Sequence, residues 1–496
     1  MQTKFIKFGL QFTIYAASLT MFCFIAHADQ PYFKQAILEN TTLLTKTSHT
    51  SDGSDRAKNG IPRFVGSLGA NATTYKGYQY AIFYTAKDRG GYGDLFAEVQ
   101  IARRKLNDAV WQYSTLPVYR LTSDDAHNRA SIAISKGDGV IHVAFDHHNT
   151  PRINYAHTAI GVADNPSQHE WNDTVFNFER NMGFEKDAIG RVTYPTFHPL
   201  PGGNLLMYFR TGGSTQGAMT LAKYNAAKSE WESIRKISSR AGHYANTVTT
   251  NKAPSFRGPY TTGGPKIDEN GRIHISWLFR EKPINCNIGG SGGGRDCNHG
   301  LYFAYSDDEG VTWYNNDGLL IANTQQSQAI SIETAGIQVA DISTLLRPSN
   351  VALNSVIDSE TGDYYAFVEH IDEQSGTSLL HRYKRTVDAQ WHSEAYDLSS
   401  PNVSLRIIGD HMFAFAGRTE ANIYYSTRDS NFSKWQTIAL PKVLDEVAIS
   451  RGYISWDLSM LESGRVSVLW HQEPEGAQYG MPSAIHTFDF NIGSED

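Results

Sequence analysis

One short segment recurs along most of this chain and limits the fold more than any other feature. Each copy is a turn that contains Gly or Asp, followed by a strand with alternating apolar and aromatic residues. Seven copies occur: KGYQYAIFYT from Lys76, GDGVIHVAFDHH from Gly137, GGNLLMYFRT from Gly202, ENGRIHISWLFR from Glu269, ETGDYYAFVEH from Glu360, GDHMFAFAGR from Gly409 and ESGRVSVLWHQ from Glu462. Short strands at regular spacing indicate an all-β repeat architecture.

Single tryptophans mark the same period. They stand at Trp111, Trp171, Trp231, Trp313, Trp391 and Trp435, and the first three are sixty residues apart. This period suits a four-stranded blade with generous loops. We therefore predict an all-β fold, a seven-bladed β-propeller of four-stranded antiparallel blades. Six or eight blades are the alternatives, because the interval from Glu269 to Glu360 is long.

The segment SDDEGVTW, from Ser306 to Trp313, is a complete Asp-box, S-x-D-x-G-x-T-W. Such a box forms the turn between the two outer strands of a propeller blade. Its Asp accepts hydrogen bonds from turn amides, and its Trp packs between blades. The motif supports the propeller prediction and says little about chemistry.

The N-terminus has the pattern of a secretory signal. Lys4 and Lys7 precede an apolar stretch, and AHA at Ala26 to Ala28 offers a cleavage site with small residues. A membrane anchor is the alternative, but no second apolar run of membrane length follows. We predict a signal peptide at residues 1–28, a single β-propeller catalytic domain at residues 29–496, and export to the periplasm or the medium.

The charge of the chain limits its partners. Loss of residues 1–28 removes two lysines and no acid, so the formal net charge goes from −7 to −9. A mildly acidic exported protein is not expected to bind nucleic acid. After signal cleavage we expect a monomer without membrane contact. A polyanionic substrate remains compatible with this charge, because a local basic cleft can oppose it.

Two cysteines remain after cleavage, Cys286 and Cys297, in the loop CNIGGSGGGRDCNH. In an exported protein they could form a disulfide. His299 follows closely, and His274 lies on the strand before the loop, so the same residues also fit a tetrahedral structural zinc site. The residues alone leave both alternatives open.

Polar residues recur where strands of neighbouring blades share a rim. A blade is an up-and-down meander, so its innermost strand starts at the rim where the next strand ends. In three successive predicted blades these positions carry His127, His147, His148, Tyr194, Arg210, Arg257, Tyr260 and Arg280. We predict that they line one cleft, although propeller rims are often polar without a direct role.

The residue types narrow the chemistry. The rim lacks the pair of carboxylates that most glycosidases use, and the chain lacks a G-x-S-x-G motif. His and Tyr can act as general base and acid, and Arg can bind a carboxylate through two parallel contacts. This set suits β-elimination from a uronic acid, with further basic residues to hold sulfate or more uronates.

Several segments resemble a known group. They are DDAHNRASIAI with IHVAFDHH, TYPTFHPL with LLMYFR, and GRIHISW with NHGLYFAYSDDEG. With the Asp-box, they resemble the secreted ulvan lyases of polysaccharide lyase families twenty-four and twenty-five, family twenty-five most closely. The resemblance covers most of the mature chain. It implies a seven-bladed propeller that cleaves an anionic sulfated algal polysaccharide, the rhamnose–uronate polymer of green algal walls, by β-elimination.

The resemblance also implies roles for individual residues. His127 and Tyr194 match the acid and base pair, in an order that stays open, and Arg210 matches the arginine that neutralises the carboxylate. His147 matches a second cleft histidine, with His148 as its alternative. Further binding candidates are Tyr244, Arg257, Tyr260 and Arg280. The group carries a structural metal near such a loop, which favours zinc at Cys286, Cys297, His299 and His274, and it needs no organic cofactor.

Two other classes compete with this interpretation. Asp-box propellers commonly host sialidase-like hydrolases, which need three arginines, a Tyr nucleophile assisted by Glu, and an acidic Asp. A convincing Glu beside the Tyr is missing here. A carbohydrate-binding propeller without catalysis is the second competitor. The products separate the three classes, because a lyase makes an unsaturated sugar end, a sialidase releases sialic acid, and a binding protein makes nothing.

Overall fold

The computed structural model describes residues 36–48, 71–86, 97–116, 129–213, 216–244, 257–261, 264–281, 297–349, 354–396, 403–417, 421–441, 451–473 and 482–493. They belong to one compact unit, Phe33–Gly493. The predicted signal peptide, His127 and Cys286 lie outside these residues.

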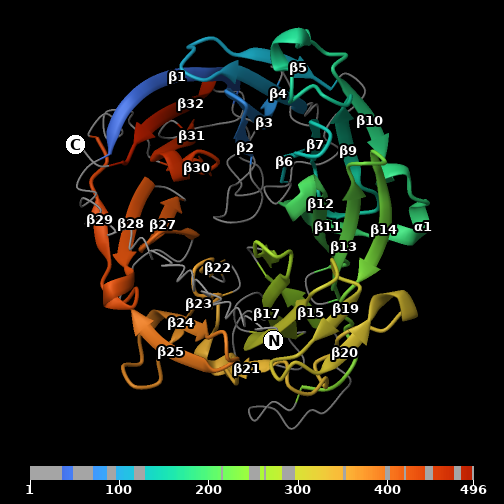
Figure 1. Ribbon diagram of the computed structural model, residues 1–496, viewed down its shortest axis with the longest axis vertical. Coiled ribbons are helices and arrows are strands. Elements are labelled where there is room, and N and C mark those ends of the chain that lie inside the picture. Colours follow the sequence, from blue (N-terminus) through green and yellow to red (C-terminus); the bar gives the residue numbers. More distant parts are fainter. Residues whose placement is uncertain are drawn as a thin grey trace, which may run out of the picture. The chain divides into compact units, whose positions relative to one another are not determined.

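The strands of this unit lie in seven antiparallel sheets that follow one another around a centre (Figure 1). The first sheet contains β2 (Ala72–Tyr75), β3 (Tyr78–Ala86), β4 (Ala97–Lys105) and β5 (Gln112–Thr115), and the second contains β6 (Ser131–Ser135), β7 (Val140–Ala144), β9 (Asn154–Thr158) and β10 (Phe176–Arg180). The third contains β11 (Val192–Pro199), β12 (Leu205–Thr211), β13 (Ala218–Asn225) and β14 (Glu230–Lys236). The short β8 (His148–Thr150) pairs with the edge of β11 in this third sheet.

Three further regular sheets lie in the second half of the chain. They are β22 (Asn354–Ile357), β23 (Tyr364–Ile371), β24 (Ser378–Arg385) and β25 (Trp391–Tyr396); β26 (Val403–Ile408), β27 (His411–Gly417), β28 (Ala421–Thr427) and β29 (Gln436–Ile438); β30 (Arg451–Asp457), β31 (Arg465–Glu473) and β32 (Pro482–Asn491), completed by β1 (Ile37–Ser48). The all-β class and the antiparallel four-stranded blade are therefore confirmed.

The prediction of a propeller with seven four-stranded blades is wrong. Six sheets form blades of the four-stranded kind, one of them with β8 as a fifth strand, and the remaining sheet has seven strands. It contains β15 (Arg257–Tyr260), β16 (Lys266–Ile267), β17 (Ile273–Glu281), β18 (Asn298–Ser306), β19 (Thr312–Tyr314), β20 (Leu320–Asn323) and β21 (Gln338–Ala340). The physical reason is the insertion after the Asp-box, because β21 returns to pair with β18.

Helices are minor in the described residues, as the sequence predicts. One α-helix, α1 (Lys186–Ile189), and short 3-10 turns occur, at Pro166–Gln168, Asn181–Gly183, Pro201–Gly203, Thr324–Gln326, Thr344–Leu346, Arg428–Ser430 and Leu461–Ser463. Within the described part of the chain, no helix has the length and apolar character that a membrane span requires.

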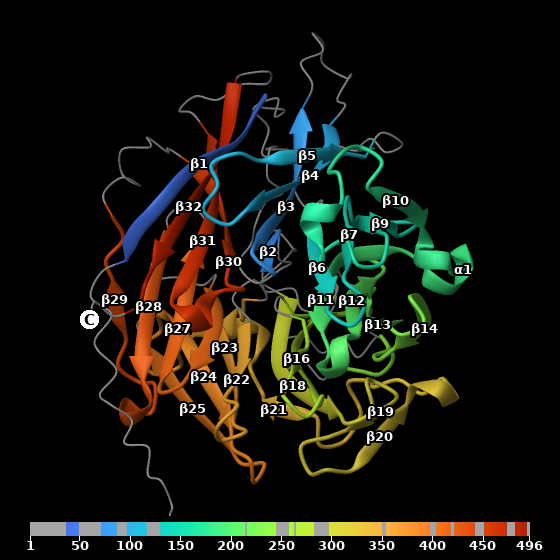
Figure 2. The same ribbon diagram turned by 45° about the horizontal axis from the view of Figure 1, so that its top comes forward.

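The first and last strands complete one sheet together. β1 pairs with β32 from Ile37 opposite Asn491 to Ser48 opposite Pro482, and Figure 2 shows β1 alongside β32. The neighbouring sheet β2–β5 is joined to it by buried polar contacts. Arg104 donates to both carboxylate oxygens of Asp489 at 2.7 Å.

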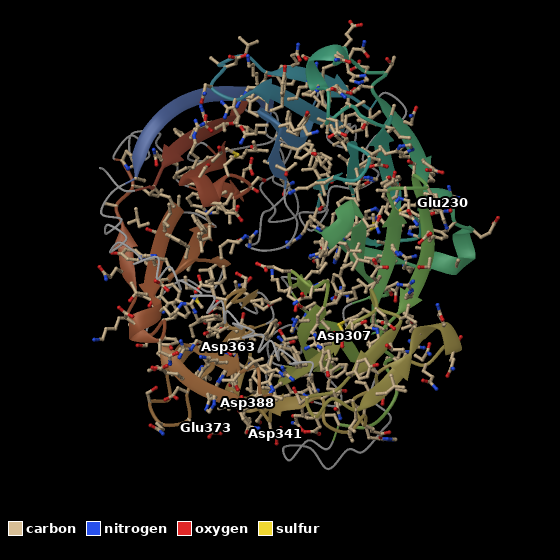
Figure 3. All side chains as sticks on the ribbon, in the orientation of Figure 1. Glu230, Asp307, Asp341, Asp363, Glu373 and Asp388 are labelled. Carbon is tan, nitrogen blue, oxygen red and sulfur yellow. The ribbon has the colours of Figure 1, made fainter. Side chains whose placement is uncertain are left out.

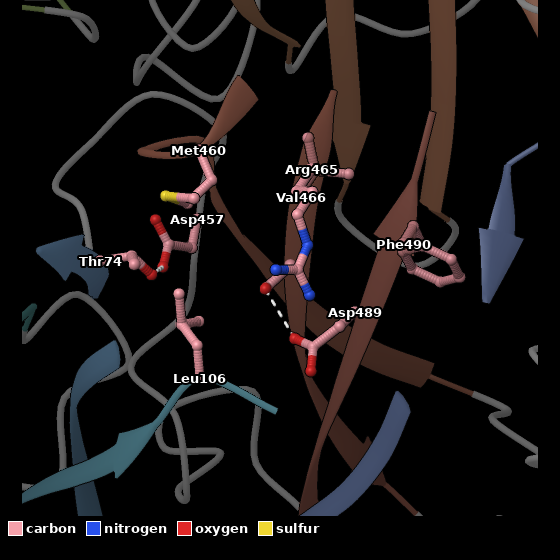
Figure 4. Close-up of a pocket in the computed structure, with 9 residues that line it drawn as sticks. Thr74, Leu106, Asp457, Met460, Arg465, Val466, Asp489 and Phe490 are labelled. Atoms are coloured by element: carbon pink, nitrogen blue, oxygen red, sulfur yellow. Dashed lines mark hydrogen bonds between the residues drawn. The ribbon is translucent and has the colours of Figure 1, made fainter. Parts of the chain in front are cut away.

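A small pocket lies at this junction. Thr74 donates to Asp457 at 2.7 Å beside it, and Arg465 and Phe490 line it (Figure 4). None of the predicted site residues lines this pocket.

The Asp-box has the structure that its sequence predicts. Asp308 accepts hydrogen bonds from the backbone N–H of Val311 at 3.1 Å and of Thr312 at 2.7 Å. Trp313 is fully buried and belongs to the core cluster that also contains Leu221 and Met219 of β13. The turn joins β18 to β19, so it fixes the outer half of the blade.

Candidate active site

The strand β7 ends before the two histidines, because the chain turns there. Asp146 and Asn149 have φ values of 59° and 58°, which L-residues adopt uncommonly. The turn sends His147 into the protein and His148 onto the next blade. The strand therefore does not carry both histidines to one cleft.

His147 supports this turn from inside the protein. It is fully buried, its Nε2 accepts a hydrogen bond from the Asn154 N–H at 2.9 Å, and its Nδ1 lies 2.6 Å from Thr150 Oγ1. Burial lowers the pKa of His147 to about 3, so the ring is neutral at ordinary pH. The prediction that His147 binds substrate does not fit this position, because both ring nitrogens are occupied.

His148 lies at the rim, where the sequence predicts a cleft residue. It belongs to β8, which pairs with β11 of the next blade so that His148 stands opposite Thr193. Its ring stacks on the Tyr194 ring, with centroids 5.8 Å apart and planes 11° apart. Of the two histidines, His148 is therefore the one that reaches the predicted site.

Tyr194 has an unusual backbone conformation. Its φ is 54°, and the pairing of β11 with β12 is interrupted between Thr193 and Thr196. A bulge of this kind redirects a side chain, and a non-glycine residue at positive φ costs about 1–3 kcal/mol. Strain of this kind concentrates at functional sites, which supports a role for Tyr194.

Arginine and tyrosine side chains alternate from Tyr194 across two blades. The Arg210 Cζ lies 5.7 Å from the Tyr194 ring centre and 4.2 Å from the Tyr260 ring centre. The Arg280 Cζ lies 4.1 Å from the same Tyr260 ring centre. We call Arg129, His148, Tyr194, Arg210, Tyr260 and Arg280 the rim cluster.

Arg129 extends this cluster at its other end. Its Cζ lies 4.6 Å from the Tyr194 ring centre, just before β6, and only 7% of the residue is exposed. The prediction from strand starts does not include Arg129, because it uses only the first residue of the segment HNRASIAIS. The signal that could have found it is the second basic residue in that segment, two positions after His127.

Arg210 is buried without a carboxylate partner among the described residues. It is 5% exposed, its Nε has no hydrogen-bond acceptor, and no described ion pair includes it. Buried charges in proteins are usually paired, because removing a charge from water is costly.

The acidic side chains labelled in Figure 3 do not come from the strands of the cluster. Glu230 lies on β14, Asp307 follows β18, and Asp388 lies between β24 and β25. Among the strands of the cluster, Glu281 at the end of β17 is the acidic residue, and its Oε1 lies 3.1 Å from His299 Nε2.

The remaining predicted binding residues are not all placed in this cluster. Tyr244 stacks on His299 instead, with ring centroids 3.6 Å apart, and burial raises its pKa to about 12. Arg257 starts β15, opposite Glu281, but its side chain lies outside the description. His127 also falls outside the described residues, so its role stays a prediction.

Two of the predicted zinc ligands, His274 and His299, lie too far apart along β17 and β18 to share one metal ion. His274 pairs with Tyr305 and His299 with Phe279, so about five residues of strand, roughly 16 Å, separate the two histidines. Zinc ligands all lie within about 2.3 Å of the metal. His274 instead stacks on Tyr364.

Cys297 is disulfide-bonded, which does not fit a zinc-bound thiolate. Within the described part of the chain, no group of three or more His, Cys, Asp or Glu side chains could hold a metal. The zinc ion remains an untested prediction that the described residues do not support.

The sequence of this chain is similar to the sequences of ulvan lyases. An ulvan lyase, long isoform, of Pseudoalteromonas sp. (strain PLSV) is 23% identical over 51% of this chain and 27% of the relative. The short isoform of Alteromonas sp. (strain LOR) is 25% identical over 39% of this chain and 40% of the relative. The match thus spans less than half the length of either relative.

Two solved structures share the fold. The polysaccharide lyase Uly1 superimposes with a TM-score of 0.65 and 16% identity, over 92% of this chain and 99% of that one. An ulvan lyase of family PL25 bound to -[GlcA(1-4)Rha3S]- gives a TM-score of 0.59 and 11% identity, over 89% and 95%. Residues 78–397 match the BNR repeat-containing family, and this chain belongs to that family.

Proposed function

We propose that this protein is a polysaccharide lyase that cleaves ulvan by β-elimination and releases oligosaccharides with a 4,5-unsaturated uronate end. The observation that carries the proposal is Arg210, a buried guanidinium between two tyrosine rings whose Nε has no acceptor. A uronate carboxylate presents two oxygens that match the geometry of a guanidinium.

The proposed reaction divides the work among three side chains. Arg210 binds the carboxylate and stabilises the negative charge that develops when C5 loses its proton. Of Tyr194 and His127, one removes this proton and the other protonates O4. The electrons of the C5–H bond form the C4–C5 double bond while the C4–O4 bond breaks, so no water is consumed.

The other members of the rim cluster extend the binding surface. Arg280 contacts the Tyr260 ring and His148 the Tyr194 ring, where sulfate groups or further uronates would contact them. A sulfated polyanion suits this surface even though the chain as a whole carries net negative charge. The relatives named as ulvan lyases support the same substrate class.

We also propose that the protein is exported. This rests on the signal-like segment at residues 1–28, with its two lysines, apolar stretch and AHA site. A polymer of algal walls is too large to enter a cell intact, so export agrees with the proposed substrate. Mass spectrometry of the secreted protein should find an N-terminus at Asp29.

The test is to follow ultraviolet absorbance while the purified protein acts on ulvan, with a non-sulfated uronate polymer and a sialylated glycan as comparisons. The proposal predicts an absorbing, unsaturated product from ulvan and little from the other two. Free sialic acid would indicate the hydrolase class. Binding of ulvan without any product would indicate a carbohydrate-binding propeller.

A further inference from the structure

Arg129 is a cation of the rim cluster without a role in the proposed elimination or in the proposed binding of further sugar groups. Arg210 lies between the two tyrosine rings, and Arg280 contacts the Tyr260 ring. Arg129 stands at the opposite end of the cluster, 4.6 Å from the centre of the Tyr194 ring. Because Arg129 is 93% buried, little water screens its charge from that ring.

A cation at this position favours the ionised form of the tyrosine. The negative charge of a phenolate spreads into the ring, and an opposite charge within about 4–6 Å typically lowers the pKa of an acid by about 1–3 units. The other titratable or charged groups near Tyr194 in the described residues are His148 from β8, Arg210 from β12 and Arg280 from β17. These groups are bases and act in the same direction when charged, whereas Tyr260, which contacts Arg210 and Arg280, is an acid that acts in the opposite direction when ionised.

We propose that Arg129 is a positioning residue that acts through Tyr194: it fixes the ring of Tyr194, whose backbone is strained, and brings the hydroxyl into the range where it exchanges a proton near neutral pH. An unperturbed tyrosine, with a pKa near 10, is a poor proton acceptor at neutral pH. The catalytic consequence rests on the proposed function, whereas the effect on the ionisation of Tyr194 does not.

The decisive experiment measures this ionisation without substrate. Protein labelled with ¹³C at the tyrosine Cζ is titrated by NMR, and the Tyr194 signal is identified as the one missing from Tyr194→Phe. We expect Tyr194 in the unmodified protein to titrate clearly below 10. A midpoint at or above 10 would overturn the proposal, and this result needs no Arg129 variant to fold.

Variants then assign the effect to Arg129. In Arg129→Met the Tyr194 midpoint should rise by about one unit or more, and Arg129→Lys should restore part of the shift. The matched control is Arg272→Met, because the Arg272 Cζ also lies 4.6 Å from a tyrosine ring, that of Tyr305, outside the rim cluster. This control should leave the Tyr194 midpoint unchanged.

The activity of the same variants separates the two proposals. If ulvan is cleaved, one limb of the pH–rate profile should move with the Tyr194 midpoint in Arg129→Met: the rising limb if Tyr194 is the base and the falling limb if it is the acid. An unchanged Tyr194 midpoint in folded Arg129→Met would contradict the role of Arg129, whatever the activity. A low Tyr194 midpoint that depends on Arg129, in a protein that cleaves no ulvan, would keep this inference and refute the proposed function.

Discussion

His147 and His148 are neighbours with opposite environments. His147 is fully buried with both nitrogens occupied, whereas His148 is partly exposed and stacks on Tyr194. Two residues at positive φ, Asp146 and Asn149, create this difference. The turn thus places His148 in the candidate site and His147 in the interior, where it supports the fold.

The two histidines should respond differently to replacement. His147→Ala leaves the buried Asn154 N–H without its acceptor, so it should lower the free energy of unfolding by about 1–3 kcal/mol. His148→Ala should change stability little and reduce product formation. Urea denaturation and the ultraviolet assay measure the two effects. The assignment is wrong if His148→Ala is the destabilising change.

Buried neutral histidines should also make the protein sensitive to acid. Burial lowers the pKa of His147 to about 3 and that of His142 well below its usual range. Because histidine in the unfolded chain titrates near 6.5, the unfolded state binds more protons below that pH. Stability is therefore fully present above about pH 6.5 and falls as the pH is lowered toward 3.

Denaturant unfolding at a series of pH values measures this loss. His147→Gln should flatten the dependence on pH, and replacement of the exposed His392 by Gln should not. A free energy of unfolding that stays constant between about pH 6.5 and 4 would show that these rings are not buried neutral in the folded protein.

At the scale of single elements, the sequence predicts where strands start and end better than it predicts where their side chains lie. It places the start of β11 and the ends of β12 and β17 at one rim, and the structure brings Tyr194, Arg210 and Arg280 together there. This grouping is predictable because an up-and-down meander determines which strand ends lie at the same rim. The position of His147 was not predictable in this way, because a local turn decides it, and Arg129 stands two positions after the start of its segment.

The predicted metal ligands around the loop between β17 and β18 show a second limit of prediction from the sequence. The spacing of Cys286, Cys297 and His299 allows either a metal or a disulfide, and His274 was added because it lies on the adjacent strand. The strand register separates His274 from His299, and register is a property of the folded sheet. Proximity in sequence therefore predicted a contact that the sheet prevents.

The disulfide at Cys297 gives a direct prediction for this loop. After loss of the signal peptide, Cys286 is the remaining possible partner in the chain. Intact mass should be lower by the two hydrogens that a disulfide loses, and reduction should destabilise the protein by about 2–4 kcal/mol. About one zinc per chain together with reactive thiols would contradict it.

The whole molecule depends on the pairing of its first and last strands. β1 completes the sheet of β30–β32, and this sheet contacts β2–β5 through Arg104 and Asp489. These contacts join the two ends of the chain in one sheet. The repeat pattern indicates an insertion in the sheet β15–β21 through the long interval from Glu269 to Glu360, but it does not reveal that β21 returns to pair with β18.

Removal of β1 should therefore open the propeller. A variant that begins after Ser48 loses all pairing with β32, and the loss is comparable with the total stability of a domain, about 5–15 kcal/mol. We expect it to lack a cooperative thermal transition, whereas a control that lacks only residues 1–28 should melt normally. An unchanged transition in the shorter variant would show that the ring does not depend on β1.

The central claim is that the unpaired guanidinium of Arg210 neutralises a uronate carboxylate during β-elimination. The most direct measurement is the rate of unsaturated product formation from ulvan by folded Arg210→Asn and Arg210→Lys. We predict a loss of about a hundredfold or more in Arg210→Asn, with poor rescue by Lys, which cannot make the two-point contact. A rate close to that of the unmodified protein in folded Arg210→Asn would contradict the account.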